Sequence, residues 1–384
     1  MTRILYKWGA KPFLDQLSGC REEIIGIMDY VEPEFIRDQA AEFRFLRTQA
    51  LKNILQLFVN NEAITVVSGT VSSITIASDN MTTQVTVGDG RIFNADFVVC
   101  ADGYDSALND MGVTGSEREE YDTLGWPASH LAMTFALPTK TVRRDEALCN
   151  IFRSSKHWNV WAGPGYILHA NISDESELVC VTITANYNRE IFEGDQTWQL
   201  RPLEYWNIDL GLFEPRVKKL LELAGSVSSR IFVRKPMLDE LVCTNSRVVL
   251  VGDAAHPILP GGNQHIGLDI EEAETLRCLF SRIEHRNQIP DFLVAYEDIR
   301  LPRTSHIVEY ERGMHLMLQM PDGPQQEARD VTLKKVMAGD WDHMDEELFR
   351  AIFGEEFQQY SCDATEEVED WWTKWGGSDL EECN

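Results

Sequence analysis

The chain has 384 residues, of which 43% are hydrophobic, so it can bury the core of one large domain or of two. Its formal net charge of −27 excludes the basic surface that partners such as nucleic acids and anionic membranes require. No stretch approaches the roughly 20 apolar residues of a membrane span, and the first residues show no signal peptide. These features predict a globular protein of the cytoplasm.

Eight cysteines are scattered along the chain, without a CxxC pair and without metal-type spacing to histidine. In a chain of this length they indicate reduced, mostly buried thiols, and they predict no metal site. Acidic residues gather in 363–370 and 379–382, where a solvated helix face and tail is a simpler interpretation than a binding surface.

The first 110 residues change from a helical pattern to a strand pattern. Residues 1–60 contain helix-spaced apolar pairs, and the strongest helix is predicted over 45–58. Short β-branched segments follow and are predicted as strands, at 63–67, 72–77 and 84–87, before a buried strand at 95–100 that runs into Ala-Asp-Gly.

Residues 123–234 form a strand-rich block with scattered aromatic side chains, interrupted by one predicted helix over 215–223. A buried strand of the parallel type is predicted at 247–251, a helix at 268–283, and mostly helix from 291 onward. This order predicts an antiparallel sheet inserted between two α/β halves, an arrangement that suits a domain covering a substrate.

The most informative motif is RVVLVGDAAHPILPGGNQHIGLDIEEAETL at 247–276. A buried strand ends at Gly252 and Asp253, a loop rich in proline and glycine follows, and a helix begins after the loop. Backbone N–H groups and the positive end of a helix can hold an anion there, and the Asp253 carboxylate can accept hydrogen bonds from ribose-type hydroxyls. On the residues alone, a helix-capping turn explains this motif as well as a ligand site does.

A second motif, ADFVVCADGYDSALN at 95–109, is a strand that enters a turn at Asp102 and Gly103, with Ser106 after it. Such a turn is common and carries little information alone. The two motifs stand in this order, about 150 residues apart, with the strand-rich block between them. Together they resemble the paired fingerprints of the class A FAD-dependent monooxygenases, in the salicylate-hydroxylase-like branch.

The resemblance implies which residues contact a cofactor. In this family the Gly-Asp pair lies against the ribityl and pyrophosphate region of FAD, and the Asp-Gly motif is associated with the flavin and the nicotinamide. The matching residues are Gly252, Asp253, Pro260, Gly262, Asp102, Gly103 and Ser106, with Arg47 as a match one residue out of step. For His256, which belongs to the first motif, a structural histidine closing the loop is favoured over a catalytic one.

Further matches to the family lie at 161–165, 295–303, 322–330 and 360–371, so the resemblance covers nearly the whole chain. It implies an α/β fold with three parts. These are an incomplete Rossmann-like FAD-binding domain, an inserted, mostly antiparallel sheet domain for the substrate, and a C-terminal helical segment with an acidic tail. The expected ranges are 1–110 with 240–300, 111–239, and 301–384, respectively.

The chain also departs from the family pattern. It contains no G-x-G-x-x-G, the turn that grips the ADP half of FAD, so on the order of 30 to 50 residues are expected to be missing before Met1. Asn263 and His265 stand where the family has loop glycines that let backbone approach the flavin. Asn109 and Thr48 stand where the family has arginines.

The function implied is that of an FAD-dependent monooxygenase using NADH or NADPH and O₂ to hydroxylate an aromatic or other electron-rich small molecule. The substrate would lie between the flavin and the inserted sheet, where Trp161, Tyr166 and His169 are candidate lining residues. Packing in the core is the simpler interpretation of each aromatic side chain. His169 can act as a base on a phenol, but no residue is singled out as catalytic. The substrate, the choice of nicotinamide and the oligomeric state are not specified.

The departures support a second hypothesis, a truncated or degenerate paralogue that is not an enzyme and no longer binds FAD productively. A mis-assigned start codon explains a missing segment, but it does not explain substitutions inside the loop. A reductase or halogenase on the same scaffold would need a nucleophile or lysine motif, and the sequence shows neither.

Overall fold

The computed structural model describes most of the chain, including the motif at 247–276 except Asn263 and the motif at 95–109 up to Ser106. The described residues are 2–17, 21–22, 43–44, 48–59, 63–77, 81–106, 127–149, 151–152, 159–173, 177–192, 194–235, 237–243, 247–262, 264–337, 354–355 and 358–376. Arg47 and Asn109, both considered above as cofactor positions, lie outside these residues.

The largest sheet has six strands, all antiparallel, in the order β11-β12-β7-β10-β9-β8. Its strands are β7 (Ser129–Pro138), β8 (Asn159–Gly163), β9 (Tyr166–Ser173), β10 (Leu178–Asn186), β11 (Gln199–Pro202) and β12 (Ser226–Val233). The helices that the chain forms between these strands are α6 (Thr139–Arg144), η1 (Leu203–Trp206), η2 (Leu210–Leu212) and α7 (Pro215–Ala224). This is the inserted antiparallel sheet that the strand-rich block predicts.

Side chains alternate between the two faces of this sheet, as the period of a strand requires. One face carries Leu131, Leu168 and Val181, which pack with Leu220 of α7 in the largest hydrophobic core. The other face turns toward the remainder of the molecule and carries polar side chains, among them His169. The sheet therefore has a core face and a face available to a site.

The second sheet is small and mixed, in the order β13-β14-β6. Its strands are β6 (Val98–Cys100), β13 (Val242–Cys243) and β14 (Val248–Leu250). β14 pairs with β6 in parallel, which confirms the parallel-type strand predicted at 247–251. The other prediction, a buried strand at 95–100, is only partly right, because β6 is the edge of this sheet within the described residues and Val99 is 43% exposed.

The third sheet is a meander of β3 (Val71–Ile76), β4 (Thr83–Val87) and β5 (Ile92–Ala95). A further strand predicted at 63–67 is wrong. Those residues are exposed and form no strand, since their β-branched side chains have no core to pack against.

Helices connect and cover the sheets. They are α1 (Thr2–Lys7), α2 (Lys11–Leu17), α4 (Thr48–Val59), α8 (His265–Phe280), α9 (Ile289–Leu318), α10 (Pro324–Met337) and α12 (Ala364–Trp375). Two-residue strands β1 (Arg21–Glu22) and β2 (Phe43–Arg44) pair with each other, and short 3₁₀ turns form η3 (Gly252–Ala254) and η4 (Arg286–Gln288). Among the described helices, none combines the length and the apolar character needed to cross a bilayer.

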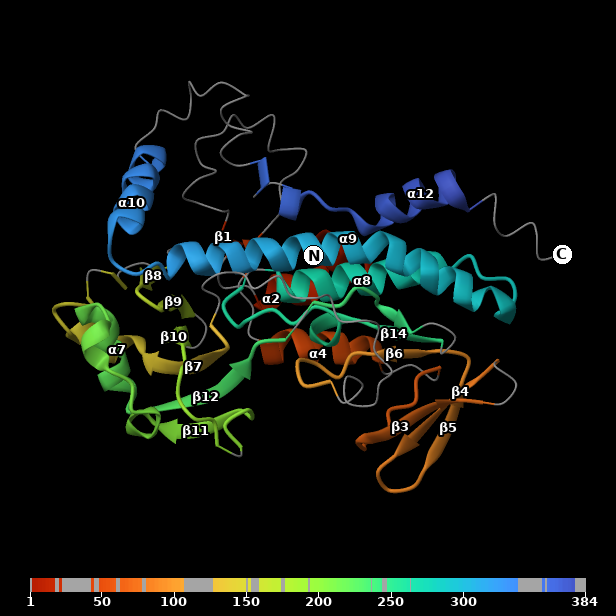
Figure 1. Ribbon diagram of the computed structural model, residues 1–384, viewed down its shortest axis with the longest axis horizontal. Helices are drawn as coiled ribbons and strands as arrows, with labels where there is room; N and C mark the ends of the chain where they lie inside the picture. Colours follow the sequence, from red (N-terminus) through yellow and green to blue (C-terminus); the bar gives the residue numbers. More distant parts are fainter. Residues whose placement is uncertain are drawn as a thin grey trace.

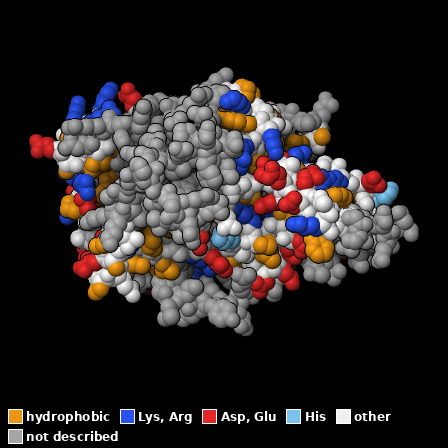
Figure 2. Space-filling model, turned by 90° about the horizontal axis from the view of Figure 1, so that it is seen from above, with side chains coloured by type: hydrophobic (Ala, Val, Ile, Leu, Met, Phe, Trp, Pro, Cys, Tyr) orange, Lys and Arg blue, Asp and Glu red, His pale blue; other side chains and the backbone are white. Residues whose placement is uncertain are grey.

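Figure 1 shows how these parts are arranged: the six-stranded sheet and the β3–β5 meander lie toward opposite ends, and the long helix α9 runs above both with α8 beside it. α12 packs on α8 and α9. The face seen in Figure 2 carries acidic and basic side chains mixed with apolar ones beside the undescribed grey atoms. The loop between β14 and α8, which contains the first motif, thus starts at the small sheet and ends at the helical layer.

Candidate functional site

The end of β14 is tied to helix α8 through one carboxylate. The chain turns sharply at Gly252, whose φ of 63° lies in the left-handed region that favours glycine. The backbone N–H of Gly252 donates to Glu272 Oε2 at 2.7 Å. A Cβ atom at this position would lie 3.1 Å from Asp269 Oδ1, so the turn and the helix leave little room for any other residue.

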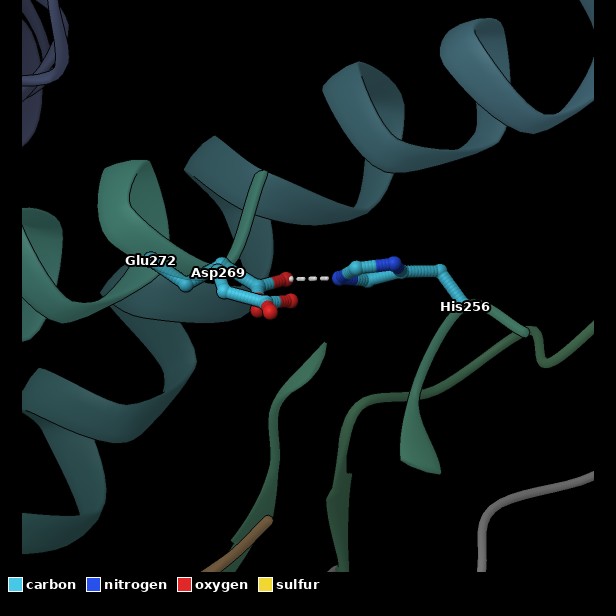
Figure 3. A group of neighbouring side chains, drawn as sticks. All are labelled: His256, Asp269 and Glu272. Atoms are coloured by element: carbon cyan, nitrogen blue, oxygen red, sulfur yellow. Dashed lines mark hydrogen bonds and ion pairs between the residues drawn. The ribbon is translucent and has the colours of Figure 1, made fainter. Parts of the chain in front are cut away.

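Glu272 also holds His256. The two side chains are buried, and His256 Nε2 lies 2.8 Å from Glu272 Oε1, as Figure 3 shows. Burial alone would lower the pKa of His256, but the attraction of Glu272 outweighs it and raises the pKa above its ordinary value. The pair fixes the loop to the helix, an arrangement that suits the structural interpretation of His256.

Asp253 lies next to this pair and contacts a second histidine. His265 Nδ1 is 3.3 Å from Asp253 Oδ1, and His265 Nε2 is 2.8 Å from the backbone oxygen of Leu259. His265, which replaces a family glycine, therefore spans the loop from Asp253 to Leu259. The Asp253 side chain remains 38% exposed, so part of its carboxylate is open to a ligand.

The side chains of His256, Asp269 and Glu272 bring one ligand atom each to within 4.8 Å of the others (Figure 3). The contact between His256 and Glu272 has the length of a hydrogen bond, and Asp269 lies beside that pair. Burial raises the pKa of the Asp269 carboxyl to about 6. The cluster is therefore best described as a hydrogen-bonded pair with a neighbouring carboxyl group, and we assign no metal to it.

A pocket lies where the two sequence motifs meet the six-stranded sheet. Tyr104 of the Asp-Gly motif and Leu259 of the Gly-Asp motif pack together with Ala132 and Phe232 of the sheet. Its lining residues come from both motifs, the sheet and α9: Tyr104, His130, Arg234, Lys235, Pro257, Ile258, Leu259, Val308, Glu311, Arg312 and His315.

Polar contacts hold the Asp-Gly turn to the sheet beside this pocket. The Tyr104 hydroxyl donates to the backbone oxygen of Val233 at 2.9 Å, and Arg230 pairs with Asp105 at 2.8 Å. The Arg230 guanidinium also lies 4.1 Å from the centre of the Phe232 ring, a cation–π contact. These contacts position the turn from strand β12, more than a hundred residues away in the sequence.

Two buried histidines, His130 and His315, line the pocket, and the partly buried His169 lies near His315. Burial lowers the pKa of His130 to about 3 and the pKa of His169 and His315 to about 4, and a second histidine nearby contributes to the shift in each case. Their imidazoles are therefore neutral at pH 7, and each can both donate and accept a hydrogen bond.

The chain is similar to curated FAD-dependent monooxygenases. It is 27% identical over 260 residues to the FAD-dependent monooxygenase atnJ of Arthrinium sp., covering 66% of this chain and 58% of that protein. It is 26% identical over 249 residues to the 3-amino-4-hydroxybenzoate 2-monooxygenase of Streptomyces cremeus, covering 64% and 56%. The chain thus spans less than two thirds of the length of these relatives. No family model matches it.

Solved structures give the fold. A salicylate hydroxylase in complex with substrate superposes with a TM-score of 0.68 at 15% identity, over 96% of this chain and 88% of that one. Klebsiella pneumoniae HpxO with FAD and uric acid superposes with a TM-score of 0.62 at 18% identity, over 88% and 84%. The chain is thus similar in sequence to FAD-dependent monooxygenases and in fold to salicylate hydroxylase. Its α/β architecture with an antiparallel sheet and C-terminal helices is that of the flavin hydroxylase fold, as the sequence predicts.

Within this flavin hydroxylase fold, the residues predicted to hold FAD occupy two neighbouring loops. Gly252 and Asp253 form η3 at the end of β14, and Pro260 and Gly262 follow in the same loop. The Pro260 carbonyl accepts a hydrogen bond from Thr184 of β10, which ties this loop to the sheet.

The second loop contains the Asp-Gly motif. Asp102 is exposed directly after β6, Gly103 has a φ of 90°, and Ser106 is buried. Gly103 therefore makes the turn that the motif predicts, in the left-handed region.

The predicted substrate-lining residues separate onto the two faces of the sheet. His169 lies against Gly261, where a Cβ atom would come 3.2 Å from the His169 ring. Tyr166 and Trp161 instead pack into the core on the α7 face, where the Tyr166 ring contacts Phe213. The structure thus brings only His169 toward the loop, and it does not bring Tyr166 or Trp161 to the pocket.

Several residues of the site were not predicted from the sequence. Tyr104, His130, Arg312 and His315 line the pocket from three separate parts of the chain, and no local pattern connects these parts. The signal for His130 was its position in the strand, since it alternates with the core residue Leu131.

Replacing Asp269 with asparagine is expected to stabilise the fold above neutral pH. Because burial raises the folded pKa of this carboxyl from 3.8 to about 6, the wild type loses stability as the pH rises through that window. The residue is exposed, and solvent screens its charge, so we expect a gain of no more than about 1 kcal/mol at alkaline pH and none near pH 4. Urea unfolding of both proteins at the two pH values measures the difference, and an equal difference at both would contradict the prediction.

Proposed function

We propose that this chain is an FAD-dependent monooxygenase that hydroxylates a small, electron-rich molecule, with NADH or NADPH as the transient reductant. One observation carries the proposal: Tyr104 and Leu259, from the two cofactor motifs, meet Ala132 and Phe232 of the sheet in a single cluster at the pocket. The relatives and the fold point to the same chemistry. We further propose that 111–239 is the substrate-covering domain, set between the two parts of the cofactor domain.

The loop residues fit the ribityl and ring half of FAD. Asp253 presents a partly exposed carboxylate that can accept hydrogen bonds from ribityl hydroxyls. At Gly261 and Gly262 a Cβ atom would lie 3.2 Å from His169 and 2.7 Å from Ile258, so only glycine permits this close course of the backbone.

Among the described residues, those around Gly252 are less suited to binding the diphosphate half of FAD. Three carboxylates, those of Asp253, Asp269 and Glu272, lie around Gly252 with the two histidines that contact them, and Glu272 already accepts the Gly252 N–H. Carboxylates repel a diphosphate. We therefore propose that this chain holds FAD mainly through the ribityl chain and the ring.

When bound, the flavin supplies the activation of O₂, and the protein supplies orientation and a water-poor pocket. The neutral imidazoles of His130 and His315 line that pocket and can accept a hydrogen bond from a phenol or an enol. Arg312, whose guanidinium donates to the backbone oxygen of Lys235 at 3.0 Å, adds a positive charge to the lining. These groups favour a substrate with a hydroxyl group, which they would orient toward the flavin.

The visible spectrum of the purified chain tests the proposal. We expect an oxidised-flavin band, either as purified or after incubation with FAD and removal of the excess. NADH or NADPH should bleach this band without O₂, and admitting air should restore it.

A folded, colourless protein that FAD does not restore would reject the proposal and favour the non-enzymatic paralogue. Two contacts support that alternative. His265 lies against the Asp253 carboxylate that would bind FAD, and the Asp269 carboxylate lies beside Gly252.

A further inference from the structure

A groove lies between helices α9 and α12, away from the cofactor motifs. It is lined by apolar, aromatic and acidic side chains together with one glycine: Asp291, Phe292, Val294, Ala295, Asp298, Trp371, Trp372, Trp375 and Gly376. In Figure 1 the two helices run alongside each other at this point. The proposed monooxygenase uses none of these residues.

The helical repeat explains why α9 presents this lining. Val294 and Ala295 lie three and four residues after Asp291, and Asp298 lies four and three residues after them, so all four share one face of the helix. Val294 is 53% exposed in the middle of that face, although it is a large apolar side chain. The carboxylates of Asp291 and Asp298 lie on either side of Val294 and Ala295 along the helix.

The tryptophans of α12 form the opposite wall. Trp371 Nε1 donates to Asp298 Oδ2 at 3.3 Å, which orients that indole across the groove. Trp372 stacks on Phe292 with the ring centres 5.7 Å apart, and the Arg282 guanidinium lies 4.9 Å from its ring centre. Trp375 is 57% exposed, so much of its indole remains accessible to a ligand.

The indole rings and carboxylates of this lining favour a positively charged ligand. Indole rings attract cations through their electron-rich faces, as the contact of Arg282 with Trp372 already shows within the chain. A purely apolar occupant would take the two aspartate carboxylates out of water, which is costly, and an anion would be repelled by them and by the net charge of −27. Among the described residues, no lysine or arginine lines the groove.

We propose that this groove binds a small organic cation, an alkylated ammonium group whose methyl groups lie against Trp371 and Trp375 and whose charge faces Asp291 and Asp298. The groove has a volume of about 200 Å³. Drug-sized ligands occupy pockets of roughly 300 to 1,000 Å³, so this space suits a head group the size of choline and not a second cofactor.

Choline is the probe, titrated into the full chain carrying isotopically labelled tryptophan and followed by the indole N–H signals in NMR spectra. We expect a saturable shift of the Trp371 signal, since its N–H donates to Asp298 and both side chains line the groove. The Trp206 signal should not move, because its N–H donates to Ser229 inside the other core. The uncharged carbon isostere of choline should produce no saturable shift.

Three variants examine the contacts, with Trp371 as the common reporter. Trp375→Ala is expected to weaken choline binding about fivefold, and Trp375→Phe, which keeps an aromatic face, to stay within about twofold of wild type. Asp298→Asn keeps an acceptor for Trp371 but removes the charge, so it should weaken binding about fivefold at low salt and less at high salt. Trp198→Ala, at a matched exposed tryptophan directly before β11 of the six-stranded sheet, should leave binding unchanged.

The proposal is overturned if choline produces no saturable shift, if the isostere binds as tightly as choline, or if Trp375→Ala leaves the affinity unchanged. A Trp371 shift that depends on protein concentration without ligand would assign the groove to a second copy of the chain, and it would overturn the proposal as well.

Discussion

Replacing Asp253 with alanine is expected to lower the affinity of the chain for FAD by roughly tenfold to a hundredfold. The variant removes a partly exposed carboxylate that we propose accepts hydrogen bonds from the ribityl hydroxyls, and such charge-assisted bonds contribute about 1.5–3 kcal/mol. It also removes one of the two partners of His265, which keeps its contact with the backbone oxygen of Leu259. Titration of the protein with FAD, followed by the quenching of flavin fluorescence, measures the change.

Asp322→Ala serves as the matched control, because it removes an equal charge from an exposed position before α10. We expect its FAD affinity to equal that of wild type. Asp269→Asn should act in the opposite direction and tighten FAD binding, since it removes a carboxylate beside Gly252. Equal affinities for wild type and Asp253→Ala would refute the assigned role of Asp253.

Replacing Arg300 with methionine is expected to destabilise the fold by about 3–5 kcal/mol. Arg300 is fully buried and lies 2.9 Å from Glu271 of α8 and 3.3 Å from Glu367 of α12, so one side chain joins three helices. The substitution leaves Glu271 buried with only Arg303, and an incompletely compensated buried charge is costly. The free energy of unfolding in urea at neutral pH is the measurement.

The pH dependence of this effect has a definite sign. Burial raises the pKa of Glu271, but Arg300 and Arg303 outweigh it and hold the pKa below its ordinary value of 4.5. The stabilisation is therefore present above pH 4.5 and is lost as the pH falls through the folded pKa, so the difference between variant and wild type should shrink in acid.

Arg286→Met is the control for the same chemical change. Its pair with Asp96 is 3.3 Å long and largely exposed, so the loss should stay below about 1 kcal/mol. If the two variants lose similar amounts of unfolding free energy, the burial of Arg300 does not determine its contribution to stability.

The local elements were largely predictable because local patterns determine them. The strand that enters Gly252 and the helix after the loop follow from a buried β-branched run and a helical repeat, and α7 follows from Pro215 at its first turn. The strand expected at 63–67 failed because β propensity requires a partner and a core, which the sequence does not reveal.

The site was less predictable because its residues meet only in three dimensions. Tyr104 and His315 lie more than two hundred residues apart yet line one pocket. Tyr166 and His169 are neighbours in β9, and an odd separation along a strand places them on opposite faces. Tyr166 was predicted to line the substrate site because it is aromatic. The alternation of side chains along the strand instead places Tyr166 on the core face and His169 on the face toward the cofactor loop.

Helix α9 contributes residues to both proposed ligand sites and fixes the distance between them. Asp298 lines the tryptophan groove near one end, and His315 lines the pocket beside the proposed flavin site near the other. Seventeen residues of helix separate them, roughly 25 Å at 1.5 Å per residue. A cation in the groove and a substrate in the pocket cannot touch, so the effects of Asp298→Asn and Asp253→Ala on their respective ligands should remain independent in the double variant.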